Sequence, residues 1–175
     1  FRFFAQDDKY DELRILLDKQ AIIRYYKKNG FAQADVKHVD VEINKERTGL
    51  ILTFTIDEGN VFKFGDITLK SNVKNLDIKN LQYKKYCKKG KVYNIDFLSM
   101  EQNQIINAIN KQGFVAVKVE PSFKYNKVTK IVDIVLNIIE TEKQYISKII
   151  IRGNDKTRDY VIRKELQFEE GDLYS

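Results

Sequence analysis

Short segments recur along this chain at a spacing of about 82 residues, and this periodicity constrains the fold more than any other feature. Residues 28–31 read KNGF and residues 111–114 read KQGF, a displacement of 83 positions. Residues 67–72 and 149–154 form a second pair, displaced by 82 positions. Self-similarity at one fixed period is typical of a tandem array in which each period is a supersecondary unit. We therefore expect repeated units rather than one continuous domain.

The first half of a period predicts a strand followed by two helices. Apolar residues alternate between residues 62 and 69, and their parity switches at Gly65, as it does at a β-bulge. Residues 75–88 are expected to form the first helix, with a lysine-rich last turn that suits the helix dipole. The second helix is expected over residues 94–112, followed by Gly113 as a C-terminal glycine with positive φ.

Two strands close the period. Residues 115–125 and 132–138 alternate between apolar and polar side chains. Because the helices run down and back, the second strand is expected antiparallel to the first, and the third strand parallel to it. Pro121 favours an edge position for the second strand, since proline has no N–H to donate to a neighbouring strand. The prediction is an α+β unit with a three-stranded mixed sheet in the order 1-3-2 and two antiparallel helices on one face.

The residues before this period contain only the later part of a unit. A helix is expected over about residues 10–29, followed by strands over residues 36–43 and 50–56. The parity of apolar residues shifts between Val36 and Val39, which indicates a bulge in the first of these strands.

The last residues contain only the start of a unit, with a strand through Ile151 and a helix over about residues 157–166. We therefore expect three segments with flexible junctions between them. They are a C-terminal part of a unit at residues 1–59, a complete unit at 60–141, and an N-terminal part of a further unit at 142–175.

Composition argues against an enzyme. The chain has 31 Lys plus Arg against 25 Asp plus Glu, a formal net charge of +6. Its one cysteine, Cys87, and its one histidine, His38, cannot form a disulfide or a histidine metal site, and a buried thiol is the favoured interpretation of Cys87. The sequence has no glycine-rich phosphate loop and no nucleophile elbow. We expect no catalytic residue, no cofactor and no bound metal.

The order strand–helix–helix–strand–strand at this period resembles the POTRA (polypeptide-transport-associated) domain. Residues 57–59 at the first junction and residues 149–155 at the second are the closest matches, together with residues 161–166 and Gly171. The order of segments is similar to that of the third, fourth and fifth POTRA domains of BamA-type outer-membrane β-barrel assembly factors. Ser71 stands where the family usually has glycine, so positive φ is not required there.

The resemblance implies a non-enzymatic scaffold at the periplasmic face of the outer membrane of a Gram-negative bacterium. The implied partners are unfolded segments of outer-membrane proteins, accessory lipoproteins of the assembly complex, and a C-terminal membrane barrel that lies outside this sequence. Nucleic acid is not an expected partner. The two partial units are complementary, so a homodimer joined through these halves is a further possibility.

Both second strands are expected at sheet edges, where unpaired N–H and C=O groups can bind an extended peptide by strand addition. The opposite interpretation is that Lys118, Lys124, Pro121 and the bulge near Val36 blunt these edges against aggregation. The residues alone favour neither, whereas the resemblance favours docking of client proteins. The residues expected at the two docking edges are Val36, His38, Val39, Val41, Val117, Val119, Pro121 and Phe123.

Two charged features have competing interpretations. Glu170 precedes Gly171 at the position where the resemblance implies contact with an accessory lipoprotein, with Arg163 on the same surface. An isolated glutamate beside a turn is more often a solvated charge. The lysines between Lys84 and Lys91 suit anionic lipid or nucleic acid, and this basic-module function is the alternative to a docking module. A run of lysines is more often a solvated face.

Overall fold

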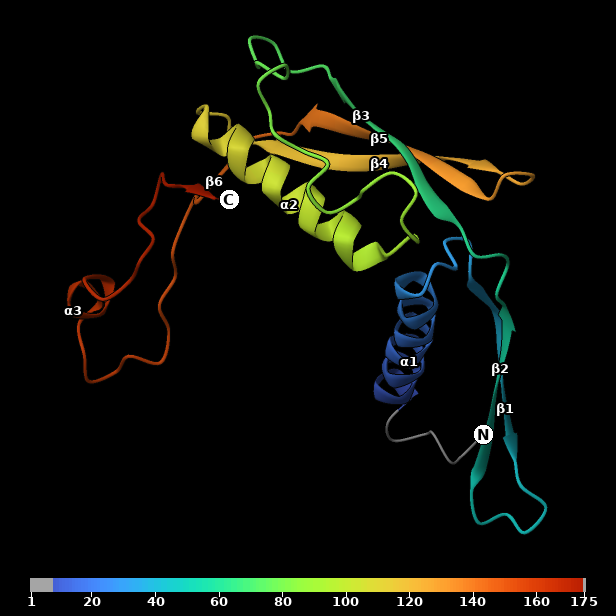
Figure 1. The fold of residues 1–175 in the computed structure, drawn as a ribbon. Coiled ribbons are helices and arrows are strands. Elements are labelled where there is room, and N and C mark those ends of the chain that lie inside the picture. The colour runs from blue at the N-terminus through green and yellow to red at the C-terminus, as the bar shows by residue number, and fades with distance from the viewer. Residues whose placement is uncertain (1–7, 175) are drawn as a thin grey trace.

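The computed structural model describes residues 8–174, and within them it contains three helices and seven strands (Figure 1). In chain order the elements are α1 (Asp8–Lys28), β1 (Asp35–Ile43), β2 (Leu50–Asp57), β3 (Lys63–Ser71), α2 (Ile95–Lys111), β4 (Val117–Asn126), β5 (Ile131–Glu140), β6 (Gln144–Tyr145), α3 (Asp159–Arg163) and β7 (Leu173–Tyr174).

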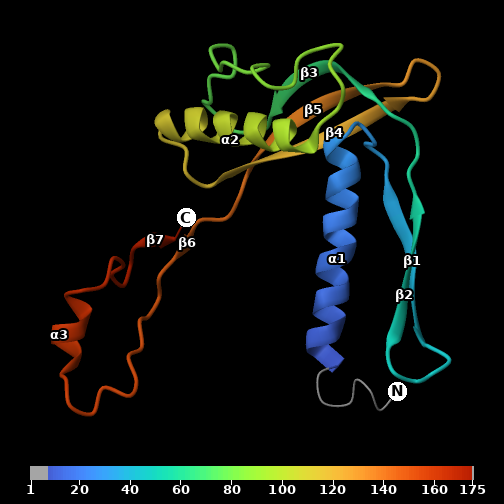
Figure 2. The ribbon, with the colours of Figure 1, turned by 60° about the horizontal axis from the view of Figure 1, so that its bottom comes forward.

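The central part of the chain is a three-stranded sheet in the order β3-β5-β4. β5 pairs in parallel with β3 and antiparallel with β4, so both the order 1-3-2 and the strand directions predicted from the sequence are confirmed. The helix α2 lies along one face of this sheet (Figures 1 and 2). The expected α+β class is therefore observed.

A core forms between α2 and the sheet. α2 begins after Asn94, whose side chain accepts a hydrogen bond from the backbone N–H of Asp96, and it turns its apolar stripe toward the sheet. Gly113 follows the helix with φ +96°, as predicted. The fully buried apolar side chains come from β3 and the residues just before it, from β5, from α2 and from the segment that joins β3 to α2: Phe62, Phe64, Ile67, Cys87, Tyr93, Ile105, Ile109, Val132, Ile134, Leu136 and Ile138.

The predicted bulge at Gly65 is present, since the register of β3 against β5 shifts between Phe64 and Ile67. A Cβ atom at Gly65 would lie 2.0 Å from Oδ1 of Asp133 and 2.6 Å from a methyl group of Ile131, so any larger residue would displace both side chains. That oxygen instead accepts a hydrogen bond of 2.8 Å from the backbone N–H of Asp66. At the bulge, a hydrogen bond to a side chain of the central strand therefore replaces one backbone hydrogen bond between β3 and β5.

The helix predicted over residues 75–88 is absent, and this prediction was wrong. The segment consists of turns, and Asn75 and Lys84 adopt positive φ of 68° and 70°, which no α-helix contains. Leu81 and Cys87 are nevertheless buried in the core. The unit therefore has one helix on its sheet, and an irregular segment occupies the place of the second.

Two side chains of the α2 region bind the backbone of this segment. Glu101 is fully buried, and its Oε1 accepts hydrogen bonds from the N–H groups of Tyr86 and Cys87 at 3.2 and 3.3 Å. Gln112 accepts from the N–H of Asp77 at 3.2 Å and donates to its carbonyl at 3.0 Å. These bonds satisfy backbone groups that a helix would pair internally. The local sequence pattern predicted a helix because it contains no sign of these bonds to residues further along the chain.

The first part of the chain is a helix beside a two-stranded hairpin (Figure 2). β1 pairs antiparallel with β2, and the register shifts between Val36 and His38, which confirms the predicted bulge. On α1, Leu13 and Leu17 are each about half exposed or more, and Leu52 of β2 is 42% exposed. The apolar surface of this part is therefore only partly covered within the described residues. Residues 1–7 of the expected first segment lie outside that description.

The last part of the chain differs from its prediction. The strand expected through Ile151 is reduced to β6, which pairs only with β7, and residues 146–151 are irregular. The expected helix over residues 157–166 is reduced to α3. In the central unit the first strand, β3, is held by the third strand, β5. Among residues 8–174 no such third strand is present for residues 146–151.

Ser71, at the matching turn of the central unit, keeps a negative φ and accepts a hydrogen bond from the N–H of Val73.

Direct contacts cross the first junction, where the sequence favoured flexibility. The carbonyl of Gly30 accepts a hydrogen bond of 2.9 Å from the N–H of Phe62. Arg24 and Lys28 at the end of α1 pair with Asp96 in the first turn of α2. Gly30 has φ +96°, and a Cβ there would lie 2.8 Å from methyl groups of both Val61 and Val92. The junction is thus a packed joint in which glycine is required.

Gly30→Ala is expected to destabilise this joint, because alanine adds both the cost of positive φ and a steric clash. Gly113→Ala is a matched control, since Gly113 has the same φ of +96° but no heavy atom within 4 Å of an added Cβ. We expect Gly30→Ala to lower the free energy of unfolding by about 1–3 kcal/mol more than the control does. Urea denaturation followed by circular dichroism measures this difference, and equal losses in the two variants would contradict the packed joint.

Candidate functional site

The outer side of β4 is the longest sheet edge that other strands leave free within the described residues. Ala116 and Thr141 lie opposite each other, and the N–H of Thr141 donates to the carbonyl of Ala116 at 2.8 Å. In an antiparallel pair, hydrogen-bonded and non-hydrogen-bonded positions alternate. Because the register continues without a shift from Val117, the backbone groups of residues 117, 119, 121, 123 and 125 point away from β5.

The sequence-predicted edge residues of β4 are the ones whose backbone faces outward. Val117, Val119, Pro121 and Phe123 are alternate residues of this strand. Their side chains share one face, on which Val119 is only 6% exposed while Phe123 is partly open and stacks on Tyr125 at 5.8 Å between ring centroids. The structure therefore brings these four residues together as a single row of backbone groups.

Two features interrupt this row. Pro121 has no N–H, and because it occupies an outward-facing position, the missing donor is lost from the free edge rather than from the ladder with β5. The carbonyl of Val119 already accepts a hydrogen bond of 2.9 Å from Nε2 of Gln102 on α2. The edge thus offers two short stretches on either side of Pro121. Sequence reasoning missed Gln102, because nothing in the local pattern of α2 indicates a bond to β4.

The edge of β1 is shorter and more irregular. The N–H of Asn44 donates to the carbonyl of Gly49 at 3.0 Å, so by the same alternation Val39 and Val41 face outward with their backbone groups. His38 lies on the other parity, opposite Thr55, and its exposed side chain lies 3.7 Å from Asp40. Val36 precedes the bulge and is 2% exposed. Of the four predicted residues on this strand, Val39 and Val41 therefore expose backbone groups on the regular part of the edge.

Charged side chains also lie along both edges. Lys118 pairs with Glu120 at 2.9 Å on β4, and Lys37 lies near Asp35 and Asp57 at the bulge of β1. Charges, a bulge and a proline are the devices by which natural sheets discourage uncontrolled pairing. These features therefore protect the two edges only in part against uncontrolled pairing. The backbone positions between the charged residues, the bulge and the proline remain open to a pairing strand.

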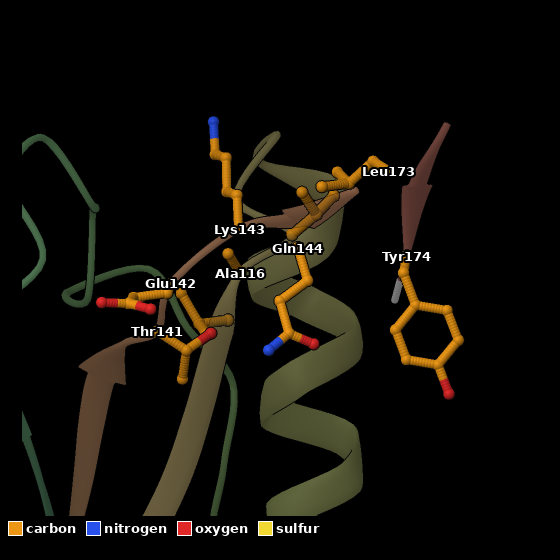
Figure 3. Close-up of a pocket in the computed structure, with 9 residues that line it drawn as sticks. Ala116, Thr141, Glu142, Lys143, Gln144, Leu173 and Tyr174 are labelled. Carbon is orange, nitrogen blue, oxygen red and sulfur yellow. The ribbon is translucent and has the colours of Figure 1, made fainter. Parts of the chain in front are cut away.

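A groove of roughly 400 Å³ continues the β4 edge beyond Val117 (Figure 3). One wall comes from residues 115–117 and 141–144, and the other from Leu173 and Tyr174 of β7. In Figure 3 the side chains of Gln144 and Tyr174 point the same way, whereas Lys143 points away from them. A peptide lying along β4 would meet this groove at its end.

Glu170 and Arg163, the residues predicted to contact an accessory protein, pair with each other and link the α3 region to residue 149. Arg163 lies 3.6 Å from Oε1 of Glu170 and donates a hydrogen bond of 2.8 Å to the carbonyl of Ile149. The same Oε1 accepts from the N–H of Ile149 at 3.2 Å. A groove of roughly 520 Å³ beside this pair is lined by Tyr160, Leu166 and Phe168 among others. Glu170 therefore has an internal structural role in addition to its exposed position.

Other kinds of site find no support in the described residues. Among residues 8–174 no group of three or more His, Cys, Asp or Glu side chains is placed to hold a metal ion. No helix in that range is both long and apolar enough to cross a bilayer. Burial in the core raises the pKa of the Cys87 thiol to about 12, and the nearby Glu101 adds to this shift. Cys87 is therefore the buried thiol that the sequence favoured, and it remains protonated at neutral pH.

The family model described as "POTRA: Surface antigen variable number repeat" matches residues 3–59 and 144–175, about half of the chain. The chain belongs to the POTRA family. This finding confirms the resemblance seen in the sequence. The POTRA match covers the two flanking parts, while the central unit lies between the matched residues.

Curated relatives place this POTRA chain among segments of the BamA type. It is 28% identical over 173 residues to "Outer membrane protein assembly factor BamA" of Neorickettsia risticii, covering 99% of this chain and 23% of the relative. The protein of the same name from Neisseria meningitidis is 26% identical over 172 residues, covering 98% of this chain and 22% of that protein. The chain thus spans about a quarter of the length of these relatives.

Solved structures share the fold. The crystal structure of Haemophilus influenzae BamA POTRA3-5 superimposes with a TM-score of 0.68 at 20% identity, covering 91% of this chain and 63% of that one. The structure of Haemophilus ducreyi BamA lacking POTRA domains 1-3 gives a TM-score of 0.53 at 18% identity, covering 77% of this chain and 24% of that one. The fold of this chain is therefore one that solved POTRA structures share.

Proposed function

We propose that this POTRA segment is a non-enzymatic scaffold of the outer-membrane protein assembly machinery, and that it docks unfolded β-barrel precursors by strand addition. Its place is the periplasmic face of the outer membrane. The names of the curated relatives support the machinery, and the chain's own geometry supports the mode of binding. The observation that carries the proposal is the row of outward-facing backbone groups on β4.

Strand addition suits clients that share strand character but no sequence. The N–H groups of Val117, Val119, Phe123 and Tyr125 supply donors, and the carbonyls of Val117, Pro121 and Phe123 supply acceptors, without reading side chains. The outward-facing Val39 and Val41 of β1 form a second, shorter edge of the same kind. His38 and Val36 flank that edge rather than contribute regular pairing positions.

Accessory lipoproteins are proposed to contact the surface around Glu170 and Arg163. The Oε1 atom of Glu170 is engaged internally, and because the side chain is 50% exposed, a cationic partner residue can reach the carboxylate. The neighbouring groove presents exposed Tyr160 and Phe168, which are side chains typical of protein interfaces. A contact here would depend on the charge of Glu170 and also on the loop conformation that the internal bonds of Glu170 maintain.

The segment boundaries expected from the sequence, 1–59, 60–141 and 142–175, are retained as part of the proposal. β2 occupies the position of a third strand and residues 146–151 that of a first strand, and in a complete unit these two positions pair. Within residues 8–174 each lacks that partner. Two copies joined through these halves would form a homodimer. In a longer chain, adjoining residues and the C-terminal membrane barrel would provide the remaining contacts.

The basic-module alternative, in which nucleic acid or anionic lipid is the main ligand, has only the charge of +6 and the lysine run in its favour. Charge-driven duplex binding weakens steeply with salt and does not depend on a sheet edge. Edge variants and salt titration therefore separate it from strand docking.

Val117→Pro is expected to weaken docking of a labelled peptide taken from a β-barrel strand, because it removes an outward-facing donor at the start of β4. Loss of one such hydrogen bond predicts about a two- to tenfold increase in Kd, measured by fluorescence anisotropy. Val117→Ala is the matched control, since it truncates the side chain but keeps the N–H. Equal affinity of the proline and alanine variants, with both folded by circular dichroism, refutes docking at this edge.

Glu170→Lys is expected to abolish recovery of accessory lipoproteins in a pulldown from membranes that carry the full-length protein. Glu170→Gln keeps an oxygen that accepts from the N–H of Ile149, so it preserves the internal bond while removing the charge. A contact that depends on charge is lost in both variants, whereas a purely structural role spares the glutamine variant. Normal recovery with both variants rules the contact out.

Light scattering with size-exclusion chromatography tests the pairing of the partial units. A mass near twice 20.6 kDa is expected if the halves exchange between chains. A Leu52→Asp variant on the free side of β2 should then return the mass to that of one chain, because a charge would be buried at the new pairing. A single-chain mass for the unmodified protein at high concentration excludes the homodimer.

A further inference from the structure

A basic groove at the packed joint is separate from both docking edges and from the Glu170 surface. It has a volume of roughly 530 Å³ and lies where the last turn of α1 meets the first turn of α2 (Figure 1). We propose that this groove binds an extended, acidic polypeptide segment that also carries apolar side chains. The lining residues include Lys85, Tyr86, Lys88, Lys91, Val92 and Phe97.

The charge of the groove is not neutralised by its surroundings. The nearby carboxylate of Asp96 is held by Arg24 and Lys28, and that of Asp66 pairs with Lys89 at 2.9 Å. Within residues 8–174, Lys85, Lys88 and Lys91 make no ion pair, so three of the lysines that line the groove carry a charge that no carboxylate compensates. A ligand with carboxylates is the complementary partner.

The groove also offers apolar surface. Phe97 is 41% exposed and Val92 is 47% exposed. Exposed apolar side chains rimmed by charges are typical of a protein-binding surface. The ring of Tyr86 is less available, because the ammonium group of Lys85 lies 5.5 Å from its centroid. An apolar residue of the ligand therefore has Phe97 and Val92 as its contacts.

The backbone at Val92 favours an extended peptide over other anions. Val92 lies opposite Lys63, and the flanking bonds run from the N–H of Phe64 to Lys91 and from the N–H of Tyr93 to Phe62. By antiparallel geometry the N–H and carbonyl of Val92 then point away from β3. In the part of the chain that the structure describes, neither group has a hydrogen-bond partner. A peptide can bond both groups of this pair together with the lysines, whereas a phosphate group can accept from the N–H and the lysines but has nothing to donate to the carbonyl.

The experiment measures anisotropy of a labelled peptide of about ten residues, in which Glu alternates with Val and Phe, added to the 175-residue chain. The groove variant combines Lys85→Gln, Lys88→Gln and Lys91→Gln. The control combines Lys45→Gln, Lys127→Gln and Lys156→Gln, which removes the same charge from exposed lysines elsewhere. The groove variant is expected to bind about tenfold more weakly, and the control to change by less than about twofold.

Further variants and peptides identify which features of the ligand the groove recognises. Phe97→Ala should also weaken the peptide, and a peptide with Gln in place of Glu should bind poorly. Val117→Pro should leave this binding unchanged, which separates it from docking on β4. Equal losses in the groove and control variants overturn the proposal, since they indicate general charge attraction. Groove-dependent binding of phosphatidylglycerol vesicles or duplex DNA in place of the peptide overturns it as well.

Discussion

The parallel pairing of β5 with β3 is the constraint on which the rest of the structure depends. It joins residues separated by more than sixty positions in the chain, and it places β5 in the middle of the sheet, where Val132, Ile134 and Leu136 are fully buried. With β5 in the middle, β4 can only be an edge strand. The free edge of β4 follows from that placement, and so does the fact that Pro121 interrupts a free edge and not the ladder with β5.

Much of the fold could be predicted because it depends on local pattern. The bulges at Gly65 and near Val36 appear as parity shifts, and the proline in β4 indicates its edge position. The segment 75–88 could not be predicted in this way. Its backbone partners, Glu101 of α2 and Gln112 directly after that helix, lie more than a dozen residues further along the chain. The strand expected at Ile151 failed for a related reason, since a strand requires a neighbour and not only a suitable sequence.

The candidate site likewise has features that follow from local sequence pattern and features that depend on tertiary contacts. Alternation alone selected Val117, Val119, Pro121 and Phe123, and the register confirms that they share one backbone direction, although their role in docking stays a prediction. On β1 the backbone direction alternates from residue to residue after the bulge, so His38 and Val39 cannot both face outward. The bond from Gln102 to Val119 and the bonds around Glu170 depend on tertiary contacts that no periodicity encodes.

The bond from Gln102 to Val119 and the proline two residues later have a kinetic consequence. An uninterrupted border would hold a newly arrived segment through many cooperative rungs, and escape would be slow. A border with two gaps would let the segment detach one short stretch at a time, so residence would be brief and exchange rapid. Such turnover suits the proposed docking role, in which a client segment is passed on and not retained.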